Sequence, residues 1–337
     1  MRVHEIQRGF GLDNMKLVER PDPAPGPGQV LLRMRAVSLN YRDLMTVEGS
    51  YNPRQPLPLV PCSDGVGEVV AVGEGVNRLA VGDRVATLFS QGWMGGRPTV
   101  EELRATLGGP LDGTLSELMA LPERGVIRVP DHLSDAEAAT LPCAALTAWS
   151  ALAEQGRVTA GDTVLVQGTG GVSIFALQFA QLLGARVIVI SKSDDKLVKA
   201  RRLGAWQEIN YLDDPHWGKT VRELTGGLGV DHIVEVGGAG TLTQSLQAIR
   251  VGGEITLVGV LAGGASEISI VPVFMKYVRI QGLLVGSRQA FDRMNRVIAQ
   301  HELRPVVDHV FPFVEARAAF EHLQSGVHFG KVCIGFE

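Results

Sequence analysis

The chain has 337 residues, of which 45% are hydrophobic and 20% charged, as expected for a globular protein long enough for two domains. A formal net charge of −4 and a pI near 6.1 provide no basic surface for nucleic acid or for an anionic membrane. We therefore expect neither of these partners.

The three cysteines at positions 62, 143 and 333 are far apart and form no Cys-x-x-Cys pair. This spacing indicates neither a disulfide framework nor a structural zinc knuckle. The N-terminal residues include no apolar signal segment, and no apolar stretch reaches a membrane-spanning length. We expect a reduced, soluble, cytoplasmic protein.

The first part of the chain, up to about residue 125, is rich in Gly and Pro and has short apolar runs bounded by turn residues. Two such runs, 29–38 and 67–72, are expected to be strands. The Pro- and Gly-rich segment 21–28 is expected to form a turn between the first strands. The pattern predicts a small, irregular β domain.

From about residue 160 onward, expected strands alternate with expected helices. The strands are expected at 163–167, 186–191, 233–236 and 254–260, and the first two helices at 172–183 and 193–204. The second helix has a Ser at its start, acids in its first turn, bases in its last turn and a closing Gly. The alternation predicts a parallel sheet with helices on both faces.

A glycine-rich loop, Gly168-Thr-Gly170-Gly171-Val172-Ser173, connects the first of these strands to the first helix. Such glycines permit a tight turn and let backbone N–H groups approach a pyrophosphate at the positive end of a helix. The last glycine of the usual Gly-x-Gly-x-x-Gly pattern is replaced by Ser173, and the alternative is an ordinary strand-to-helix turn. The surrounding strands and helix favour a Rossmann-type dinucleotide-binding domain.

The end of the second strand indicates which dinucleotide binds, because an acid there accepts hydrogen bonds from the adenosine ribose and repels a 2′-phosphate. Here the strand ends at a neutral Ser191, with Lys192 and Lys196 nearby. The alternative is that both lysines are solvated, and Asp194 and Asp195 weaken the positive field. We favour NADPH over NADH.

Several motifs together carry a family resemblance: Asn40-Tyr-Arg42-Asp43, Pro61-Cys-Ser-Asp-Gly-Val-Gly-Glu-Val69, Leu141-Pro-Cys-Ala-Ala-Leu-Thr-Ala-Trp149 and the Gly168 loop. Over its whole length the chain resembles the medium-chain dehydrogenase/reductase superfamily, most closely its zinc-independent, quinone-oxidoreductase-like and alcohol-dehydrogenase-like branch. The resemblance implies an α/β fold with a GroES-like, β-rich catalytic domain at 1–127, completed by 300–337. A Rossmann domain with a doubly wound parallel sheet is expected at 128–299, and a homodimer is expected through its sheet edge.

The resemblance also bears on zinc. Zinc-dependent members have a Cys where this chain has Asn40, and Gly-His-Glu where it has Cys62-Ser63-Asp64. Only Cys143 matches a ligand position, and the four close cysteines of a structural zinc site are missing, so we predict no metal. Cys62 is interpreted as a small buried residue on a crowded turn, the alternative being a substrate-facing thiol. Asp64 is interpreted as a hydrogen-bond anchor in preference to a general base.

Catalytic candidates follow from the same resemblance. Tyr51 matches the tyrosine that enoyl-thioester reductases of the superfamily place near the substrate carbonyl, although it could also be a surface turn residue. Asn40 and Arg42 lie on the loop that faces the nicotinamide in relatives. The expected cofactor contacts are Thr147, Gly168, Gly170, Gly171, Val172, Ser191, Lys192, Lys196, Tyr211, Gly237, Gly259, Val260, Leu261, Leu284, Val285, Gly286 and Lys331. Lys331 is expected at the pyrophosphate, or else in solvent.

The expected function is an NADPH-dependent oxidoreductase that transfers hydride to a quinone, an enone or another activated C=C without a metal. Two alternatives stay open. One is an alcohol dehydrogenase or carbonyl reductase of the same superfamily. The other is a redox sensor that binds NADPH without turnover.

Overall fold

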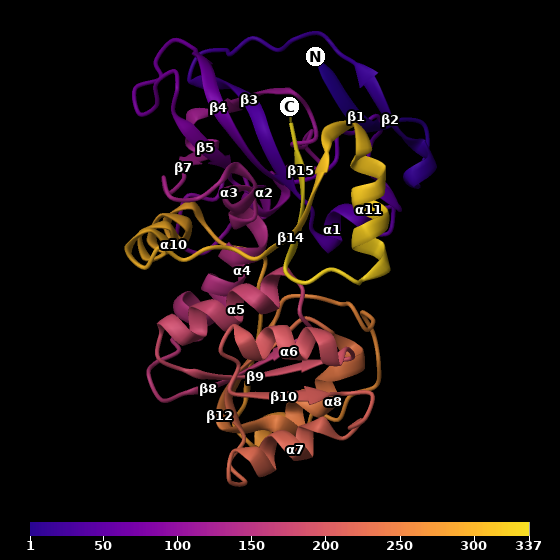
Figure 1. Cartoon of the computed structure of the whole chain (residues 1–337), viewed down its shortest axis with the longest axis vertical. Helices are drawn as coiled ribbons and strands as arrows, with labels where there is room; N and C mark the ends of the chain where they lie inside the picture. The colour runs from indigo at the N-terminus through magenta and orange to yellow at the C-terminus, as the bar shows by residue number, and fades with distance from the viewer. Residues whose placement is uncertain (337) are drawn as a thin grey trace. The chain divides into compact units, whose positions relative to one another are not determined.

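The computed structural model describes residues 1–336, which divide into two compact units (Figure 1). Unit 1 comprises Met1–Leu146 and Gly286–Glu337, and unit 2 comprises Thr147–Val285. The predicted domain boundaries differ from these, because 128–146 and 286–299 belong to unit 1. Helix α10 (Arg288–Gln300) accounts for part of this difference, since Arg288 Nη1 donates to the carbonyl oxygens of Arg124 and Val126 at 2.6 and 2.7 Å.

Unit 1 is built on a mainly antiparallel sheet in the order β14-β15-β3-β4-β5-β7, with β6 also paired to β3. Its strands are β3 (Gln29–Ser38), β4 (Asp64–Val72), β5 (Arg84–Thr87), β6 (Leu118–Pro122), β7 (Val126–Arg128), β14 (Val307–Pro312) and β15 (Lys331–Gly335). A separate hairpin pairs β1 (Arg2–Ile6) with β2 (Met15–Glu19). The expected strand at 29–38 is confirmed, and segment 21–28 connects β2 to β3 as predicted.

The helices of unit 1 are α1 (Tyr41–Val47), α2 (Val100–Arg104), α3 (Asp135–Ala139), α10 and α11 (Ala316–Ser325). Among them, α3 and α11 contact the sheet, and α1 contacts α11. Side chains of β1, α1, α11 and β15 share one core, which includes Ile6, Leu44, Phe320 and Ile334. The C-terminal segment therefore completes the fold begun by the N-terminal part of the chain.

Unit 2 is a parallel sheet in the order β10-β9-β8-β11-β12-β13. The strands are β8 (Thr163–Gln167), β9 (Arg186–Ser191), β10 (Gln207–Asn210), β11 (Val230–Glu235), β12 (Ile249–Leu257) and β13 (Arg279–Gly282). In chain order the sheet reads 3-2-1-4-5-6, which is the Rossmann arrangement. The predicted α/β fold is confirmed, and β8 and β9 have the predicted bounds.

Helices cover both faces of this sheet, as the alternating sequence pattern predicts (Figure 1). They are α5 (Gly171–Leu182), α6 (Asp194–Arg202), α7 (Trp217–Leu224) and α8 (Ala239–Ala248), with α4 (Leu146–Trp149) and α9 (Val271–Met275) as shorter elements. Helix α6 begins where the Ser193 hydroxyl accepts the Lys196 N–H, so the predicted cap is confirmed. No helix within residues 1–336 is long and apolar enough to cross a membrane.

Candidate functional site

The predicted cofactor residues of unit 2 follow the carboxyl ends of its parallel strands. Because the strands are parallel, these ends lie at one edge of the sheet, where open α/β sheets bind ligands. The residues concerned are Gly168 after β8, Ser191 at the end of β9, Tyr211 after β10, Gly237 after β11, Gly259 after β12 and Leu284 after β13. Strand order reverses between β8 and β11, so the Gly168 and Gly237 loops flank the topological switch point.

The Gly168 loop has the geometry that a pyrophosphate requires. Gly168 has φ of +73°, in the left-handed region that favours glycine, and Gly170 is the N-cap of α5. A Cβ built at either glycine would meet no heavy atom within 4 Å, so the loop leaves open space beside the helix N-terminus. Ser173, which replaces the last glycine of the motif, is buried and donates its hydroxyl to the Gln167 carbonyl at 2.5 Å. The residues therefore fit a dinucleotide.

A buried carboxylate, which the sequence analysis did not identify, holds the two switch-point loops together. Glu235 ends β11 and is inaccessible to solvent. Its Oε1 accepts the N–H groups of Gly237 and Gly238, both at 3.0 Å, and the Thr241 hydroxyl at 2.5 Å. Its Oε2 accepts the Ser245 hydroxyl and, at 2.7 Å, Gln167 Nε2. Gln167 ends β8, so this network joins the strands on both sides of the switch point.

Gln167 completes the network with its amide oxygen, which accepts the Val236 and Gly237 N–H groups at 3.3 and 3.1 Å. Every polar group of the Gln167 side chain is thus used within unit 2. The sequence did carry a signal for this site: Glu235 is an acid at the end of an apolar strand and directly before Val-Gly-Gly. Buried acids are rare unless they are paired, so this position alone indicated a polar network.

The residues expected at the adenosine end lie between β9 and α6. Ser191 is buried, and its hydroxyl accepts the Ser193 N–H at 3.4 Å. Lys192 is exposed and forms no ion pair with a carboxylate in the described part of the chain. Asp194 accepts a hydrogen bond from Asn210 Nδ2 at 2.8 Å. The end of β9 therefore presents a neutral side chain followed by an accessible cation.

The other predicted cofactor residues differ in exposure. Thr147 and Val285 are buried, whereas Val260, Leu261 and Leu284 are exposed. Val285 has φ of +52° and is followed by Gly286, the first residue of the second segment of unit 1. These positions are compatible with cofactor contacts, which stay predictions.

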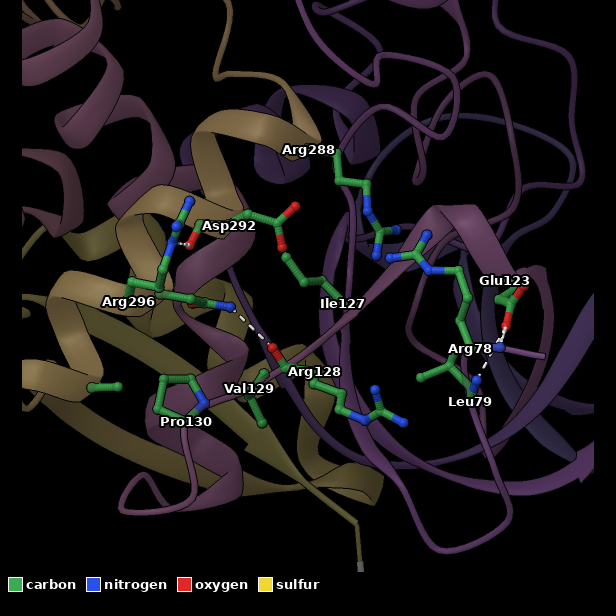
Figure 2. A pocket seen from close by; sticks show the side chains of 12 residues that line it. Arg78, Leu79, Glu123, Ile127, Arg128, Val129, Pro130, Arg288, Asp292 and Arg296 are labelled. Carbon is green, nitrogen blue, oxygen red and sulfur yellow. Dashed lines mark hydrogen bonds between the residues drawn. The ribbon is translucent and has the colours of Figure 1, made fainter. Parts of the chain in front are cut away.

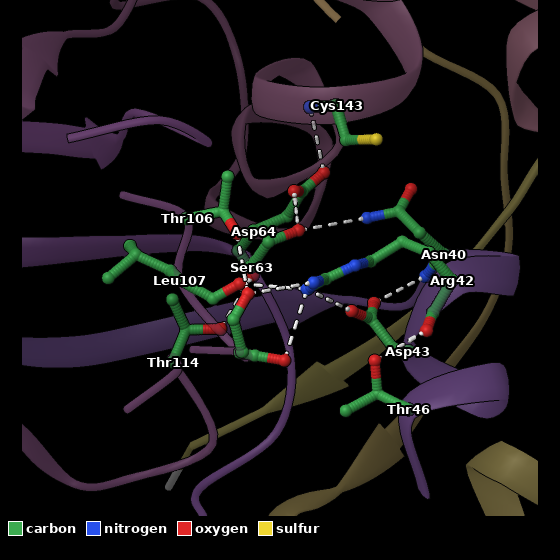
Figure 3. Close-up of polar contacts among 12 residues, drawn as sticks. Asn40, Arg42, Asp43, Thr46, Ser63, Asp64, Thr106, Leu107, Thr114 and Cys143 are labelled. Atoms are coloured by element: carbon green, nitrogen blue, oxygen red, sulfur yellow. Dashed lines mark hydrogen bonds and ion pairs between the residues drawn. The ribbon is translucent and has the colours of Figure 1, made fainter. Parts of the chain in front are cut away.

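In unit 1 the motif residues gather in a buried polar cluster (Figure 3). The members of this polar cluster are Asn40, Arg42, Asp43, Ser63, Asp64, Cys143 and Lys331. The Asp64 carboxylate has no solvent exposure; its Oδ1 accepts the Ser63 hydroxyl at 2.7 Å and its Oδ2 accepts the Cys143 N–H at 3.0 Å. Asp64 therefore ties β4 to the turn that carries Cys143, and its interpretation as a hydrogen-bond anchor is confirmed. Burial raises the pKa of Asp64 to about 6, although Lys331 and the hydrogen bond from Ser63 act in the opposite direction.

Lys331 belongs to this polar cluster. Its ammonium is buried and donates to the Leu39 carbonyl and to Asn40 Oδ1, both at 2.5 Å. The expectation that Lys331 faces a pyrophosphate or solvent is therefore wrong. The ammonium instead fixes the Asn40 side chain, whose Nδ2 donates to Ser63 Oγ at 3.5 Å. The pairing of β15 with β3 brings Lys331 to this position.

Arg42 connects α1 to the loop at residues 107–109. Its Nη1 donates to the carbonyl oxygens of Leu107 and Gly108 at 2.8 and 3.2 Å, and its Nη2 donates to that of Gly109 at 3.2 Å. The guanidinium also lies 4.7 Å from the centroid of the Tyr51 ring. Because these donors bind loop carbonyls, the geometry assigns Arg42 to positioning and revises its interpretation as a catalytic donor.

Tyr51 is the most accessible of the three catalytic candidates, with 42% of its surface exposed. Its backbone is fixed, because its N–H and that of Ser50 both donate to the Met45 carbonyl, at 3.1 and 2.9 Å. The Arg42 guanidinium packs over one face of the Tyr51 ring and so restricts the position of the phenol. Tyr51 therefore combines a fixed ring with an accessible surface, as a donor to a small molecule requires.

The thiols of Cys62 and Cys143 are poorly suited to chemistry as thiolates. Cys62 is fully buried in the unit 1 core and has φ of +74°, and a Cβ on Gly113 would lie 2.1 Å from its carbonyl oxygen. The interpretation of Cys62 as a small residue on a crowded turn is confirmed. Burial raises the pKa of Cys62 and of Cys143 well above the ordinary value, so both thiols stay protonated at neutral pH.

Comparison with known proteins gives the family. Residues 26–131 match the alcohol dehydrogenase GroES-like domain, and residues 171–300 match the zinc-binding dehydrogenase domain. A zinc-type alcohol dehydrogenase-like protein of Schizosaccharomyces pombe is 40% identical, with 98% of this chain and 97% of that protein covered. An acryloyl-coenzyme A reductase of Metallosphaera sedula is 30% identical over 94% and 95% of the two chains.

A crystal structure described as an alcohol dehydrogenase from Sinorhizobium meliloti superposes with a TM-score of 0.93, at 43% identity and with 99% and 98% of the chains covered. The chain belongs to the zinc-type alcohol dehydrogenase-like family of medium-chain dehydrogenases/reductases. It is accordingly an NAD(P)H-dependent oxidoreductase.

The family name implies zinc, but the donor groups of this chain do not fit it. No three His, Cys, Asp or Glu side chains within residues 1–336 are grouped so that they could hold a metal ion. At the place where the resemblance would put a catalytic zinc, Asp64 accepts hydrogen bonds from Ser63 and the Cys143 N–H, and Asn40 accepts one from Lys331. A catalytic zinc needs three protein ligands, and Cys62, being confined to the core, cannot join Cys143.

Proposed function

We propose that the protein is an NADPH-dependent reductase that transfers hydride to a quinone, an enone or another activated C=C without a metal. One observation carries this proposal: the groups at the family's metal position are engaged with one another by hydrogen bonds and supply too few ligands. Similarity to an acryloyl-coenzyme A reductase, whose name specifies a substrate with an activated C=C, supports the choice of acceptor.

The residues of the chain can supply the remaining needs of such a reduction. Bound at the Gly168 and Gly237 loops, NADPH would provide the hydride. When hydride adds to one carbon of a conjugated C=C, negative charge develops on the carbonyl oxygen, and a hydrogen-bond donor must stabilise it. We assign this task to the Tyr51 hydroxyl, which would donate its proton to that oxygen and regain one from water; the enol so formed would tautomerise to the saturated carbonyl compound. Asn40 accepts a hydrogen bond from Lys331 in the polar cluster of unit 1, and we propose that it orients the substrate that accepts the hydride.

The preference for NADPH follows from the end of β9. Ser191 adds no negative charge at the end of the strand, and the next residue, Lys192, is an exposed cation that a 2′-phosphate could reach, although Asp194 and Asp195 in the first turn of α6 weaken its field. A binding experiment tests the preference, because NADPH should bind at least about tenfold tighter than NADH and Lys192→Gln should remove most of this difference. Equal affinities in the unmodified protein would contradict it.

The reaction is tested with EDTA-treated protein and NADPH against a benzoquinone, an enone, an enoyl thioester and an aldehyde, with each organic product identified and the zinc content measured. We expect turnover of the quinone or reduction of a C=C at less than stoichiometric zinc. Activity with the aldehyde alone, lost on metal removal, would instead establish an alcohol dehydrogenase, the activity named for several relatives. NADPH binding without product would establish a binding protein.

We also propose that the protein is a homodimer formed through the β13 edge of unit 2. Among the described residues β13 pairs with β12 alone, so its other edge is open. In the segment that precedes β13, the apolar residues Val271, Phe274, Met275 and Tyr277 in and after α9 are all more than half exposed. Size-exclusion chromatography with light scattering should give a dimer, and Phe274→Glu should give a monomer. A monomeric unmodified protein would contradict the proposal.

A further inference from the structure

A depression on the surface of unit 1 is lined by four arginines (Figure 2). It has a volume of about 330 Å³ and is formed by the loop after β4, by the segment around β7 and by α10. The arginines are Arg78, Arg128, Arg288 and Arg296. Two acids, Glu123 and Asp292, also line it, so that the number of cations exceeds the number of acids.

Internal pairing uses part of this charge and leaves a clear excess of cations. Glu123 is committed to the backbone, because its Oε1 accepts the N–H groups of Asn77, Arg78 and Leu79. Arg128 is paired with Asp83 at 2.7 Å. Within residues 1–336, Arg78, Arg288 and Arg296 form no ion pair with any carboxylate. Three guanidinium groups therefore face two carboxylates, Glu123 and Asp292, which leaves an excess of one positive charge.

The two central arginines are held in place by their surroundings. The hydrogen bonds that backbone N–H groups donate to Glu123 fix the turn that carries Arg78, and Nη1 of Arg288 donates to the carbonyls of Arg124 and Val126. Nε and Nη2 of Arg288 accordingly remain as donors. Figure 2 shows the guanidinium ends of Arg78 and Arg288 close together. Burial first, and the charge of Arg78 second, lower the pKa of Arg288.

Asp292 and Glu123 offset part of the repulsion between Arg78 and Arg288, and an anion between the two guanidinium groups would relieve the rest. Guanidinium groups match the oxygen spacing of phosphate and bind it through paired hydrogen bonds. The floor beside the arginines is apolar, formed by Leu79, Ile127, Val129 and Pro130. We propose that this depression binds the phosphate group of a phosphorylated organic molecule, with Arg78 and Arg288 on the phosphate and the organic part against the apolar floor.

Binding should be measured by calorimetry on the full-length protein at constant ionic strength, with inorganic phosphate, pyrophosphate and phenyl phosphate as probes. Phenyl phosphate should bind more tightly than inorganic phosphate, because only the ester can use the apolar floor. Arg78→Gln should weaken binding by about tenfold or more, the size expected for loss of a charge-assisted hydrogen bond. Arg78 is exposed and forms no ion pair with any residue that the structure describes, so this variant should fold.

Two further arms make the test specific. Arg288→Lys keeps the charge but removes the planar fork, and it should also weaken phenyl phosphate binding. Arg8→Gln, which alters an exposed arginine outside the depression, should leave it unchanged. NADPH affinity should be equal in the Arg78 variant and the unmodified protein. The proposal is wrong if Arg78→Gln binds all three probes normally, or if saturating NADPH abolishes the binding, because the phosphate would then occupy the cofactor loop.

Discussion

Replacing Asp64 with Asn should stabilise the protein at neutral pH. Asp64 is a fully buried carboxylate that ties Ser63 to the Cys143 backbone, and its pKa is raised to about 6 mainly by burial. Asn has the same shape and no charge. Its amide oxygen can accept the Cys143 N–H, and its amide nitrogen can donate to the Ser63 hydroxyl, which both donates and accepts.

The magnitude follows from the difference between the ordinary and the folded pKa. A carboxyl with a raised pKa holds its proton more tightly when folded, so its contribution to stability is fully present below 3.8 and is lost as the pH rises through about 6. A shift of this size corresponds to ~3 kcal/mol. The Asn variant should therefore match the unmodified protein near pH 4 and exceed its free energy of unfolding by up to ~3 kcal/mol near pH 8.

Urea unfolding, followed by circular dichroism and by tryptophan fluorescence, measures this difference across the pH range. Asp308→Asn is a suitable control with the opposite sign, because hydrogen bonds from His322 and the Phe329 N–H outweigh burial and hold the pKa of Asp308 below its ordinary value. Asp308 therefore stabilises the fold at neutral pH, and this contribution is lost on acidification. Parallel pH profiles for Asp64→Asn and the unmodified protein would refute the reasoning.

Three further predictions test the Glu235 network of unit 2 and, in unit 1, Tyr51 and Lys331. Glu235→Gln should lower the free energy of unfolding by ~2–4 kcal/mol, because its amide nitrogen would face groups that now donate hydrogen bonds to the carboxylate. The same variant should bind NADPH about tenfold more weakly, and an unchanged affinity in calorimetry would contradict this. Tyr51→Phe should lower kcat by about 100-fold and leave the Kd of NADPH unchanged, whereas full activity would remove Tyr51 from the chemistry. Lys331→Met should destabilise the fold by ~2–4 kcal/mol and raise the pKa of Asp64. In the pH profile of the unfolding free energy, the transition due to Asp64 should then be centred at a higher pH than in the unmodified protein.

The cofactor half of the site was largely predictable from the sequence, for a topological reason. Once strands and helices alternate, the strands are parallel and their carboxyl ends share an edge, so residues after each strand come together without further information. Gly168 and Ser191 were located in this way, whereas Gly237 was assigned from the family resemblance. The order of the strands was added by the structure, and it is this order that places Gln167 and Glu235 on adjacent strands and allows their hydrogen bond.

The polar cluster of unit 1 could not be derived in the same way. Lys331 and Asn40 are widely separated in the chain, and they meet because β15 pairs with β3. No periodicity of the sequence encodes the pairing of two strands so far apart, and a lysine before a terminal strand is usually exposed. Arg42 was misinterpreted for a related reason, because its partners are backbone carbonyls of 107–109, which look alike in any sequence.

The composition of the polar cluster gives an electrostatic argument for the proposed metal independence. At neutral pH its charged groups are the carboxylates of Asp43 and Asp64 and the cations of Arg42 and Lys331, while the raised pKa of Cys143 keeps that thiol neutral. The buried charges therefore already balance. Adding a dication would place two uncompensated positive charges beside Lys331, which is costly where water is excluded, unless two thiolates formed. The family resemblance implies that Asn40 stands where the zinc enzymes supply one of these thiolates, so the residue that would deprive zinc of a ligand would also deprive it of the charge that it needs.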